Sequence, residues 1–500
     1  MVETEEVSTM LLHISSNSDY CEFLHSEKNN LSFSDRKRLL QNQRFRSALW
    51  RFRKLDPALA SDFILPLYSQ VGGRQAFDPA IMLRSYLLMQ RLGFNSIDNW
   101  VAEARSDPCI QYIIGSWYIP AVATHYDFIN RIMKVDPHLD ELYPSGKNST
   151  DTKKQLREMK LKKNEKWENY DEGVTRDLKD RYWEDASCDL DRSTLAAEQI
   201  FNCLAVTPSS DIGLIDSENL ILSGDGSALH IHSSPFGHKV KDADDNDLTH
   251  RYTAPDADIG WDSDLGVAYF GYTLYNISHH NALLGVDLPV FLTLRTASQH
   301  DALTTISATA QYLDINPELH PKFMCFDSAS DAYDIYEYLR HQNTIPVIDW
   351  NKRKSGSKNP YAEYEHISER GIPVCQSGVE MVRDGYDNSK MATKYRCPFK
   401  KGRINSCPFV EQCSKSDYGR VVKVYDKTNL KLFSPLMYGS NEWKEIYKNR
   451  TSTERINNRI LNDYGLHSLS CWNGSKHFFF MMLAGINIHL DAWAKAEHFS

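Results

Sequence analysis

Residues 443–466 read WKEIYKNRTSTERINNRILNDYGL, a stretch that predicts one helix of about five turns ending at Gly465. Tyr447, Arg450 and Glu454 are spaced three and four residues apart, so this helix would present a ring, a guanidinium and a carboxylate along one stripe. Three isoleucines fall beside the stripe and would hold the helix against a core: Ile446, Ile456 and Ile460. A lone glutamate on a charged helix is usually a solvated surface group. Glu454 therefore gains a functional interpretation only through partners elsewhere in the chain.

Two aspartates far upstream follow apolar runs that are typical of buried strands. Asp225 ends the run LILSGD, and Asp327 ends the run KFMCFD. Carboxylates at the carboxyl ends of strands lie where open α/β sheets place their chemistry. Two such aspartates and a helical glutamate would hold a pair of hard divalent cations, which activate one oxygen and stabilise another in phosphodiester cleavage. Asp225, Asp327 and Glu454 are therefore the candidate catalytic and metal-binding residues.

These residues and their neighbours resemble the DDE transposases of bacterial insertion sequences. The resemblance is carried by DGS at Asp225, by FDSASDAYDIYEYLR around Asp327, and by the pattern Y-x2-R-x3-E that ends at Glu454. It extends from about residue 55 to the C-terminus and is greatest to the group with an RNase H-like core and a Tyr-Arg-Glu-Lys helix signature. One departure is visible, because the family's Lys lies seven residues after the Glu, where this chain has Leu461.

The resemblance implies roles for these residues. Asp225, Asp327 and Glu454 would hold two Mg²⁺ ions, with Mn²⁺ as an alternative, and Tyr447 and Arg450 would contact the DNA backbone. His300 and the following aspartate resemble a family motif near the active site. They are candidates for DNA contacts or for support of the acidic residues, and an ordinary loop is the alternative.

The resemblance also implies an activity and its partners. The chain would cut double-stranded DNA at the terminal inverted repeats of an insertion sequence and join the freed 3′ ends to target DNA. A homodimer in the bacterial cytoplasm, associated with the nucleoid, is expected. Two alternatives stay open: a related nuclease that cuts without joining, and a DNA-binding descendant of a transposase that has lost the activity.

Composition limits the classes of protein to consider. The chain has 500 residues, of which 41% are hydrophobic, so it can build a sizeable core over several domains. The formal charge of −9 argues against a uniformly basic DNA-binding protein, although local basic faces remain compatible with it. No apolar run approaches the length of a membrane span, and the acidic opening MVETEEV is unlike an export signal. We therefore expect a cytosolic protein that does not enter a membrane.

Changes in sequence texture predict six segments: a polar and basic arm (1–50), a helical domain for DNA binding or dimerisation (51–143), a charged linker or insertion (144–192), the first part of an RNase H-like core (193–350), a cysteine-containing insertion (351–440), and the last part of the core with the Glu454 helix (441–500). A solvated tail or helix is the default interpretation of the first segment, and a DNA-contacting arm is the alternative. The third reads as an exposed helix or a partly disordered spacer.

The predicted fold class is α/β, with a mixed five-stranded sheet flanked by helices. Alternating or β-branched runs predict strands at LILSGDGSALHI, at 266–278, at 288–298, at KFMCFD and at IPVIDWN. Three strands followed by two more, with helices between, is the order of the RNase H fold. That order places the first and fourth strands side by side, which would bring Asp225 and Asp327 together.

Four cysteines lie within 39 residues of the predicted insertion: Cys375, Cys397, Cys407 and Cys413. Four thiols in so short a segment suggest a structural Zn²⁺ site with tetrahedral geometry. The 21, 9 and 5 intervening residues match no standard zinc finger, so unligated cysteines in a small subdomain are the alternative.

Overall fold

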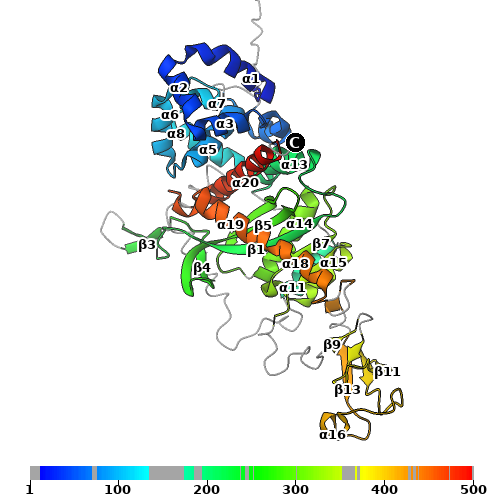
Figure 1. Ribbon diagram of the computed structural model, residues 1–500. Coiled ribbons are helices and arrows are strands. Elements are labelled where there is room, and N and C mark those ends of the chain that lie inside the picture. Colours follow the sequence, from blue (N-terminus) through cyan, green and yellow to red (C-terminus); the bar gives the residue numbers. More distant parts are fainter. Residues whose placement is uncertain are drawn as a thin grey trace, which may run out of the picture.

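The computed structural model describes the chain over residues 12–69, 76–134, 174–184, 194–236, 238–241, 247–251, 253–299, 301–351, 366–368, 372–425, 430–431, 435–436, 438–471 and 473–497. It is a mixed α/β protein in which a helical domain and a mixed sheet lie on opposite sides of the C-terminal helix α20 (Gly474–Glu497) (Figure 1). No helix in this described part combines the length and apolar character needed to cross a bilayer.

The N-terminal domain is entirely helical. Its α-helices are α1 (Asn17–Ser26), α2 (Phe33–Gln41), α3 (Gln43–Phe52), α4 (Ser61–Ile64), α5 (Pro79–Leu92), α6 (Ile97–Ser106), α7 (Pro108–Ile114) and α8 (Val122–Ile132). Helix α5 starts where the Asp78 side chain accepts a hydrogen bond from the Ala80 N–H, with Pro79 at the first helical position. It ends at Gly93, whose φ of +81° is left-handed. Nearly every side chain between is buried, so α5 is the central helix of this domain.

The predicted arm over residues 1–50 is not a solvated tail where the structure describes it. Helices α1 to α3 belong to the helical domain, and Phe45, Ala48 and Phe52 of α3 are buried in the main core. Those three residues recur at helical spacing, so they form one apolar face despite the basic residues between them. The basic composition of this stretch concealed an amphipathic pattern.

The central sheet has six strands, one more than predicted. They are β1 (Ile221–His230), β4 (Asp258–Asp262), β5 (Val267–Asn281), β6 (Val286–Thr296), β7 (Phe323–Phe326) and β8 (Ile345–Ile348). Five of them follow the order β6-β5-β1-β7-β8, and β4 pairs with the first residues of β5. Strands β5 and β6 are antiparallel to their neighbours, whereas β7 and β8 run parallel to β1.

Helices cover both faces of the sheet. The hydroxyl groups of Tyr275 of β5 and Thr305 of α14 (Asp301–Ile315) share a hydrogen bond at 3.0 Å. Helix α14 therefore lies on the face of the sheet to which Tyr275 points. The next residue, Asn276, points the opposite way and bonds Asn457 of α19 (Thr451–Asn458) at 2.6 Å. Helix α20 lies on the same side as α19, since Gly485 approaches Leu292, the cross-strand partner of Asn276.

Most of the predicted charged linker lies outside the described residues, apart from α11 (Val174–Glu184). This helix packs beside α15 (Tyr333–His341): Lys179 forms an ion pair with Glu337, and Trp183 stacks on His341 with 3.8 Å between ring centroids. At least this part of the linker is therefore part of the core domain.

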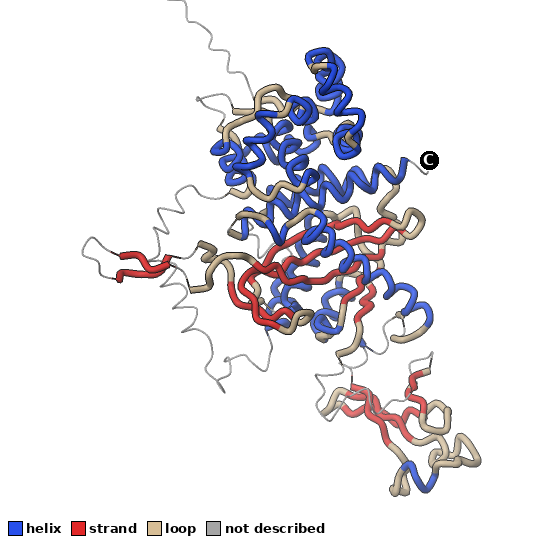
Figure 2. The backbone as a smooth tube through the Cα atoms, turned by 60° about the vertical axis from the view of Figure 1, so that its left-hand side comes forward, coloured by secondary structure: helices blue, strands red, loops and turns tan. Residues whose placement is uncertain are grey.

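The cysteine-containing insertion forms a small lobe of its own (Figure 2). Its strands are β9 (His366–Ile367) paired with β10 (Pro373–Val374), and the antiparallel sheet of β11 (Val382–Asp387), β12 (Ala392–Arg396) and β13 (Val421–Tyr425). A short helix, α16 (Val410–Cys413), lies in the long connection between β12 and β13.

Candidate active site

Asp225 of β1 and Asp327, which directly follows the neighbouring parallel strand β7, lie close together, since the Asp327 carboxylate raises the pKa of Asp225. The register pairs Ile221 with Phe323 and Ser223 with Cys325, and Asp225 and Asp327 each come two residues after the last of these pairs. Paired residues of adjacent strands point to the same face, about 4.8 Å apart along the sheet. Asp225 lies in the middle of β1 and not at its end, because β1 continues to His230.

A third carboxylate continues this row, and the sequence interpretation overlooked it. Phe326 of β7 pairs with Ile348 of β8 at the ends of both strands, and Asp327 and Asp349 are the residues that follow directly. Asp349 accepts hydrogen bonds from the Tyr438 hydroxyl at 2.6 Å and from the Trp350 N–H at 2.9 Å. The signal was available, since Asp349 follows the apolar run IPVI just as Asp327 follows FMCF.

The helical stretch predicted around Glu454 is continuous, but its helix type changes along its length. Helix α18 (Asn441–Tyr447) is capped by the Ser440 side chain, a 3₁₀ turn spans Lys448–Arg450, and α19 is followed by a π-helical turn over Arg459–Asp463. Gly465, with φ of +69°, ends it as predicted.

Arg450 joins the helix to the aspartate row. Its Nη1 lies 3.3 Å from Oδ2 of Asp225, and its Nη2 lies 2.6 Å from Oε1 of Glu454. The guanidinium carbon also lies 5.9 Å from the centre of the Tyr447 ring. Two acids that are far apart in sequence, Asp225 and Glu454, thus share one arginine, which partly neutralises them.

Electrostatics at this site oppose the charge on Asp225. Burial and the neighbouring Asp327 carboxylate raise the pKa of Asp225 to about 7, although Arg450 and the Gly226 N–H lower it. Asp301, at the start of α14, adds to the rise, and its Oδ1 lies 3.5 Å from where a Cβ on Gly226 would be. The acids therefore carry more negative charge than Arg450 compensates, a setting that favours a bound cation.

The donor set suits a hard divalent cation in its chemistry, because the row supplies carboxylate oxygens and an excess of negative charge. Within the described residues, no three His, Cys, Asp or Glu side chains already lie close enough together to hold an ion. Glu454 is engaged by Arg450, so it would join Asp225 and Asp327 at an ion only after exchanging that partner.

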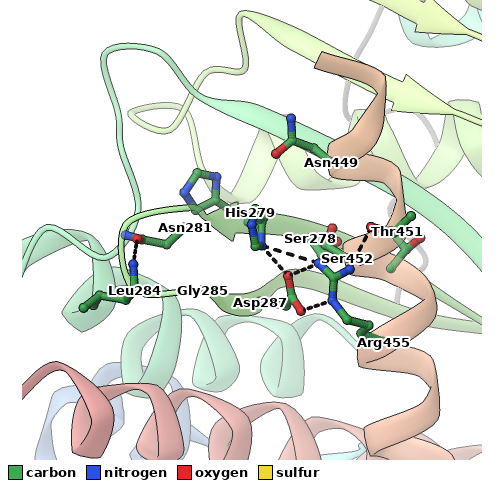
Figure 3. Close-up of polar contacts among 12 residues, drawn as sticks. Ser278, His279, Asn281, Leu284, Gly285, Asp287, Asn449, Thr451, Ser452 and Arg455 are labelled. Carbon is green, nitrogen blue, oxygen red and sulfur yellow. Dashed lines mark hydrogen bonds and ion pairs between the residues drawn. The ribbon is translucent and has the colours of Figure 1, made fainter. Parts of the chain in front are cut away.

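A second arginine fastens α19 to the sheet next to Glu454. Arg455 binds both carboxylate oxygens of Asp287 on β6, at 2.5 and 2.7 Å, and also donates to the Thr451 hydroxyl at 2.7 Å (Figure 3). Ser452 bonds Ser278 of β5 at 2.7 Å in the same view. These contacts fix where the Glu454 side chain leaves the helix.

Leu461, which occupies the place of the family lysine, is nearly buried and lines an open hollow of about 560 Å³ beside Gly226 and Asp301. Arg459 does not replace that lysine, because it is paired with Asp491 of α20 at 2.6 Å. Histidines 230, 232 and 467 line the same hollow. His300, the remaining predicted DNA contact, lies outside the described residues.

A larger hollow of about 620 Å³ is lined by Glu454, Arg455, Arg459 and Lys495 among others. Glu454 thus borders one open hollow, and Gly226, the neighbour of Asp225, borders the other. Open, polar hollows of this kind suit an extended substrate better than a small enclosed one.

No family model matches this chain, and no curated protein matches it.

Proposed function

We propose that this protein is a DDE-type transposase, which cuts DNA at the ends of an insertion sequence and joins the freed 3′ ends to target DNA. The observation that carries the proposal is that Arg450 bonds both Asp225 and Glu454, and that Asp327 lies close enough to Asp225 to raise its pKa, although 229 residues separate Asp225 from Glu454. Acidic side chains gathered from two central strands and one helix are the ligands that two-metal phosphodiester chemistry requires.

The strand arrangement supports the finer fold assignment that belongs to this proposal. In the order β6-β5-β1-β7-β8, β5 is antiparallel to both β6 and β1, while β7 and β8 run parallel to β1, an arrangement compatible with the RNase H-like order that the resemblance implies. In that arrangement β1 and β7 are central neighbours, and α19 covers the face to which Asp225 points.

Asp225, Asp327 and Glu454 would hold Mg²⁺ in this proposal. When bound, the metal supplies charge stabilisation and alignment for the attacking and leaving oxygens of the phosphodiester. The protein itself would hold these three carboxylates in fixed positions, so that other arrangements of the reacting oxygens are excluded. Arg450 would transfer its hydrogen bonds from Glu454 to a DNA phosphate, where a guanidinium binds two oxygens at once. Tyr447 would support that contact from one turn away.

Replacing Glu454 by Gln tests the assignment. The substrate is a labelled duplex made from the genomic sequence that flanks the coding region, incubated with Mg²⁺. We expect the variant to cut roughly 10³-fold more slowly or worse, a loss of about 4 kcal/mol of transition-state stabilisation, while gel-shift binding of the duplex stays within about twofold.

The matched control is Glu445→Gln, since Glu445 belongs to the same helical stretch but is 69% exposed and pairs with the equally exposed Lys448. This variant should cut at the wild-type rate. Wild-type cleavage by Glu454→Gln, or cleavage in EDTA, would overturn the proposal. Pre-cut ends distinguish the alternatives: cutting without joining indicates a nuclease, and binding without cutting by the wild type indicates a DNA-binding descendant.

A further inference from the structure

The lobe inserted between β8 and α18 contains a group of side chains that the proposed reaction does not use. Cys375, Cys397, Cys407 and Cys413 line one small cavity of about 30 Å³. Cys375 follows β10, Cys397 follows β12, and the other two come from the connection that contains α16. All four are free thiols, and none is fully exposed.

Backbone turns hold these cysteines at the cavity wall. The Gly378 N–H donates to the Cys375 carbonyl at 2.8 Å, and the Lys401 N–H donates to the Cys397 carbonyl at 3.1 Å. Turns of this kind bring a thiol and the following backbone N–H groups to the same side, where the N–H groups can stabilise a thiolate. The chain path therefore favours thiolates facing one point.

Gly419 lies very close to Cys397 at the wall of this cavity, at a distance that leaves no room for a larger residue. A Cβ at this position would lie 2.6 Å from the Cys397 Cβ and 3.3 Å from its Sγ. Its φ of +74° also favours glycine. Only the smallest residue lets β13 and the Cys397 turn meet so closely.

The lobe has little apolar core to support its own folding. Its buried apolar side chains among the described residues are Met381, Ala392, Val422 and Val424, with a few partly buried neighbours packed around them. Domains with so small a core usually depend on a metal ion or on disulfides. No disulfide joins the described cysteines, so a metal is the remaining source of stability of that kind.

We infer that the four thiols bind one structural Zn²⁺ ion. Four thiolates in tetrahedral geometry are the typical ligands of a structural zinc ion, and the cavity that the four cysteines line has room for a single ion. Binding releases the thiol protons and leaves a residual charge of −2, which Lys400 and Arg420 on the cavity wall partly offset.

The four thiols would reach a common metal ion by rotation of their side chains, without a change in the backbone. The Cys375 thiol lies 3.0 Å from the Ser377 hydroxyl, and the described part of the chain has no three potential ligands already close enough to hold an ion. Rotation about χ1 moves a sulfur by ångströms at small cost when the backbone is already in place. Metal binding then orders the lobe, which couples occupancy to its folding.

Metal analysis of the full chain tests the inference. Protein purified in a phosphine reductant without chelator should contain about one zinc per chain, and Co²⁺ in its place should give thiolate-to-cobalt charge-transfer absorption. Cys407→Ser and Cys413→Ser should each lower the zinc content to about a tenth or less of the wild-type value. Cys21→Ser, which changes an exposed cysteine of α1, is the matched control and should leave the content unchanged.

Limited proteolysis guards against variants that simply fail to fold. A strong zinc chelator added to the wild type should open cleavage sites within 372–425, while the helical domain stays resistant. Glu454→Gln should keep its zinc, so a failure of the zinc inference can be told apart from a failure of the proposed transposase activity. Zinc-free wild-type protein that gives no cobalt–thiolate absorption, or zinc that stays after both serine substitutions, would overturn the inference.

Discussion

At the residue scale, Arg450 and Asp225 determine the electrostatic state of the proposed site. Arg450 divides its guanidinium between Asp225 and Glu454, yet the pKa of Asp225 is still raised to about 7 by burial and by Asp327. A folded-state pKa above the ordinary value of 3.8 means that ionising Asp225 costs stability. That cost is fully present above about pH 7 and vanishes as the pH falls towards 4.

We therefore expect Asp225→Asn to be more stable than the wild type in EDTA at pH 8, by roughly 2–4 kcal/mol. The amide has nearly the same shape as the carboxylate but carries no charge to bury. Urea unfolding at pH 8 and pH 4 measures this difference, which should disappear at pH 4. Adding Mg²⁺ should raise the midpoint of the wild type only. A variant that is less stable than the wild type at pH 8 would contradict this account.

At the element scale, the position of Glu454 depends on the contacts that hold α19 against the sheet. Arg455 binds Asp287 through two hydrogen bonds, and Asp287 is mostly buried whereas Arg455 is about half exposed. Because the Arg455 side chain is half exposed, solvent screens this pair, which contributes only about 1 kcal/mol to folding. Its larger effect is geometric, because it holds the residue next to Glu454.

Arg455→Ala and Asp287→Ala should each slow Mg²⁺-dependent DNA cleavage by about 10- to 100-fold, since small displacements of a catalytic group have effects of that size. The double variant should be no slower than the worse single variant, because both remove the same contact. Arg455→Lys should restore little, since Lys lacks the forked donor geometry. Lys448→Ala, at an exposed position on the same stretch, is the control. Additive effects in the double variant would show that the two residues act separately.

At the scale of the whole molecule, Asp491 of α20 connects the helical domain to the core. Its carboxylate is bound by side chains from α3, α5 and the turn after α19: Arg51 at 2.7 Å, Arg91 at 3.0 Å, Arg459 at 2.6 Å and the Tyr464 hydroxyl at 2.6 Å. Burial alone would raise the pKa of Asp491, but these partners, Arg91 foremost, lower it. A depressed pKa stabilises the fold at any pH above the ordinary value, and this stability is lost as the carboxylate is protonated in acid.

Asp491→Asn should lower the free energy of unfolding by about 2–4 kcal/mol at pH 7, because three arginines lose a shared charged partner. The difference from the wild type should shrink below about pH 4, where the wild-type carboxylate becomes protonated as well. Urea unfolding across pH 3–8 measures it, with the exposed Asp463→Asn as a control expected to change stability by less than about 0.5 kcal/mol. If the free energy of unfolding of Asp491→Asn were below that of the wild type by the same amount at pH 3 and at pH 7, packing and not charge would account for the effect.

Local patterns in the sequence were enough to predict the secondary structure around the site. The helix over 443–466, its end at Gly465, and the strands that carry Asp225 and Asp327 all depend on spacing between nearby residues, which one sequence displays directly. For residues 1–50 a solvated tail or helix was expected, and the described part is helical; the burial of one face of α3 was not predicted, because charged residues lie between its apolar ones.

The relations between distant segments came only from the tertiary structure. The 102-residue register, the row that adds Asp349, the position of Arg450 between two acids, and the shared cavity of four cysteines join residues that no local period connects. Such contacts depend on which buried faces pack together, and the pKa of Asp225 depends on the burial that results. The sequence by itself determined which side chains could do chemistry here and on which kinds of element they lie. The packed fold decided which of them meet, because strand register and burial are properties of the whole chain.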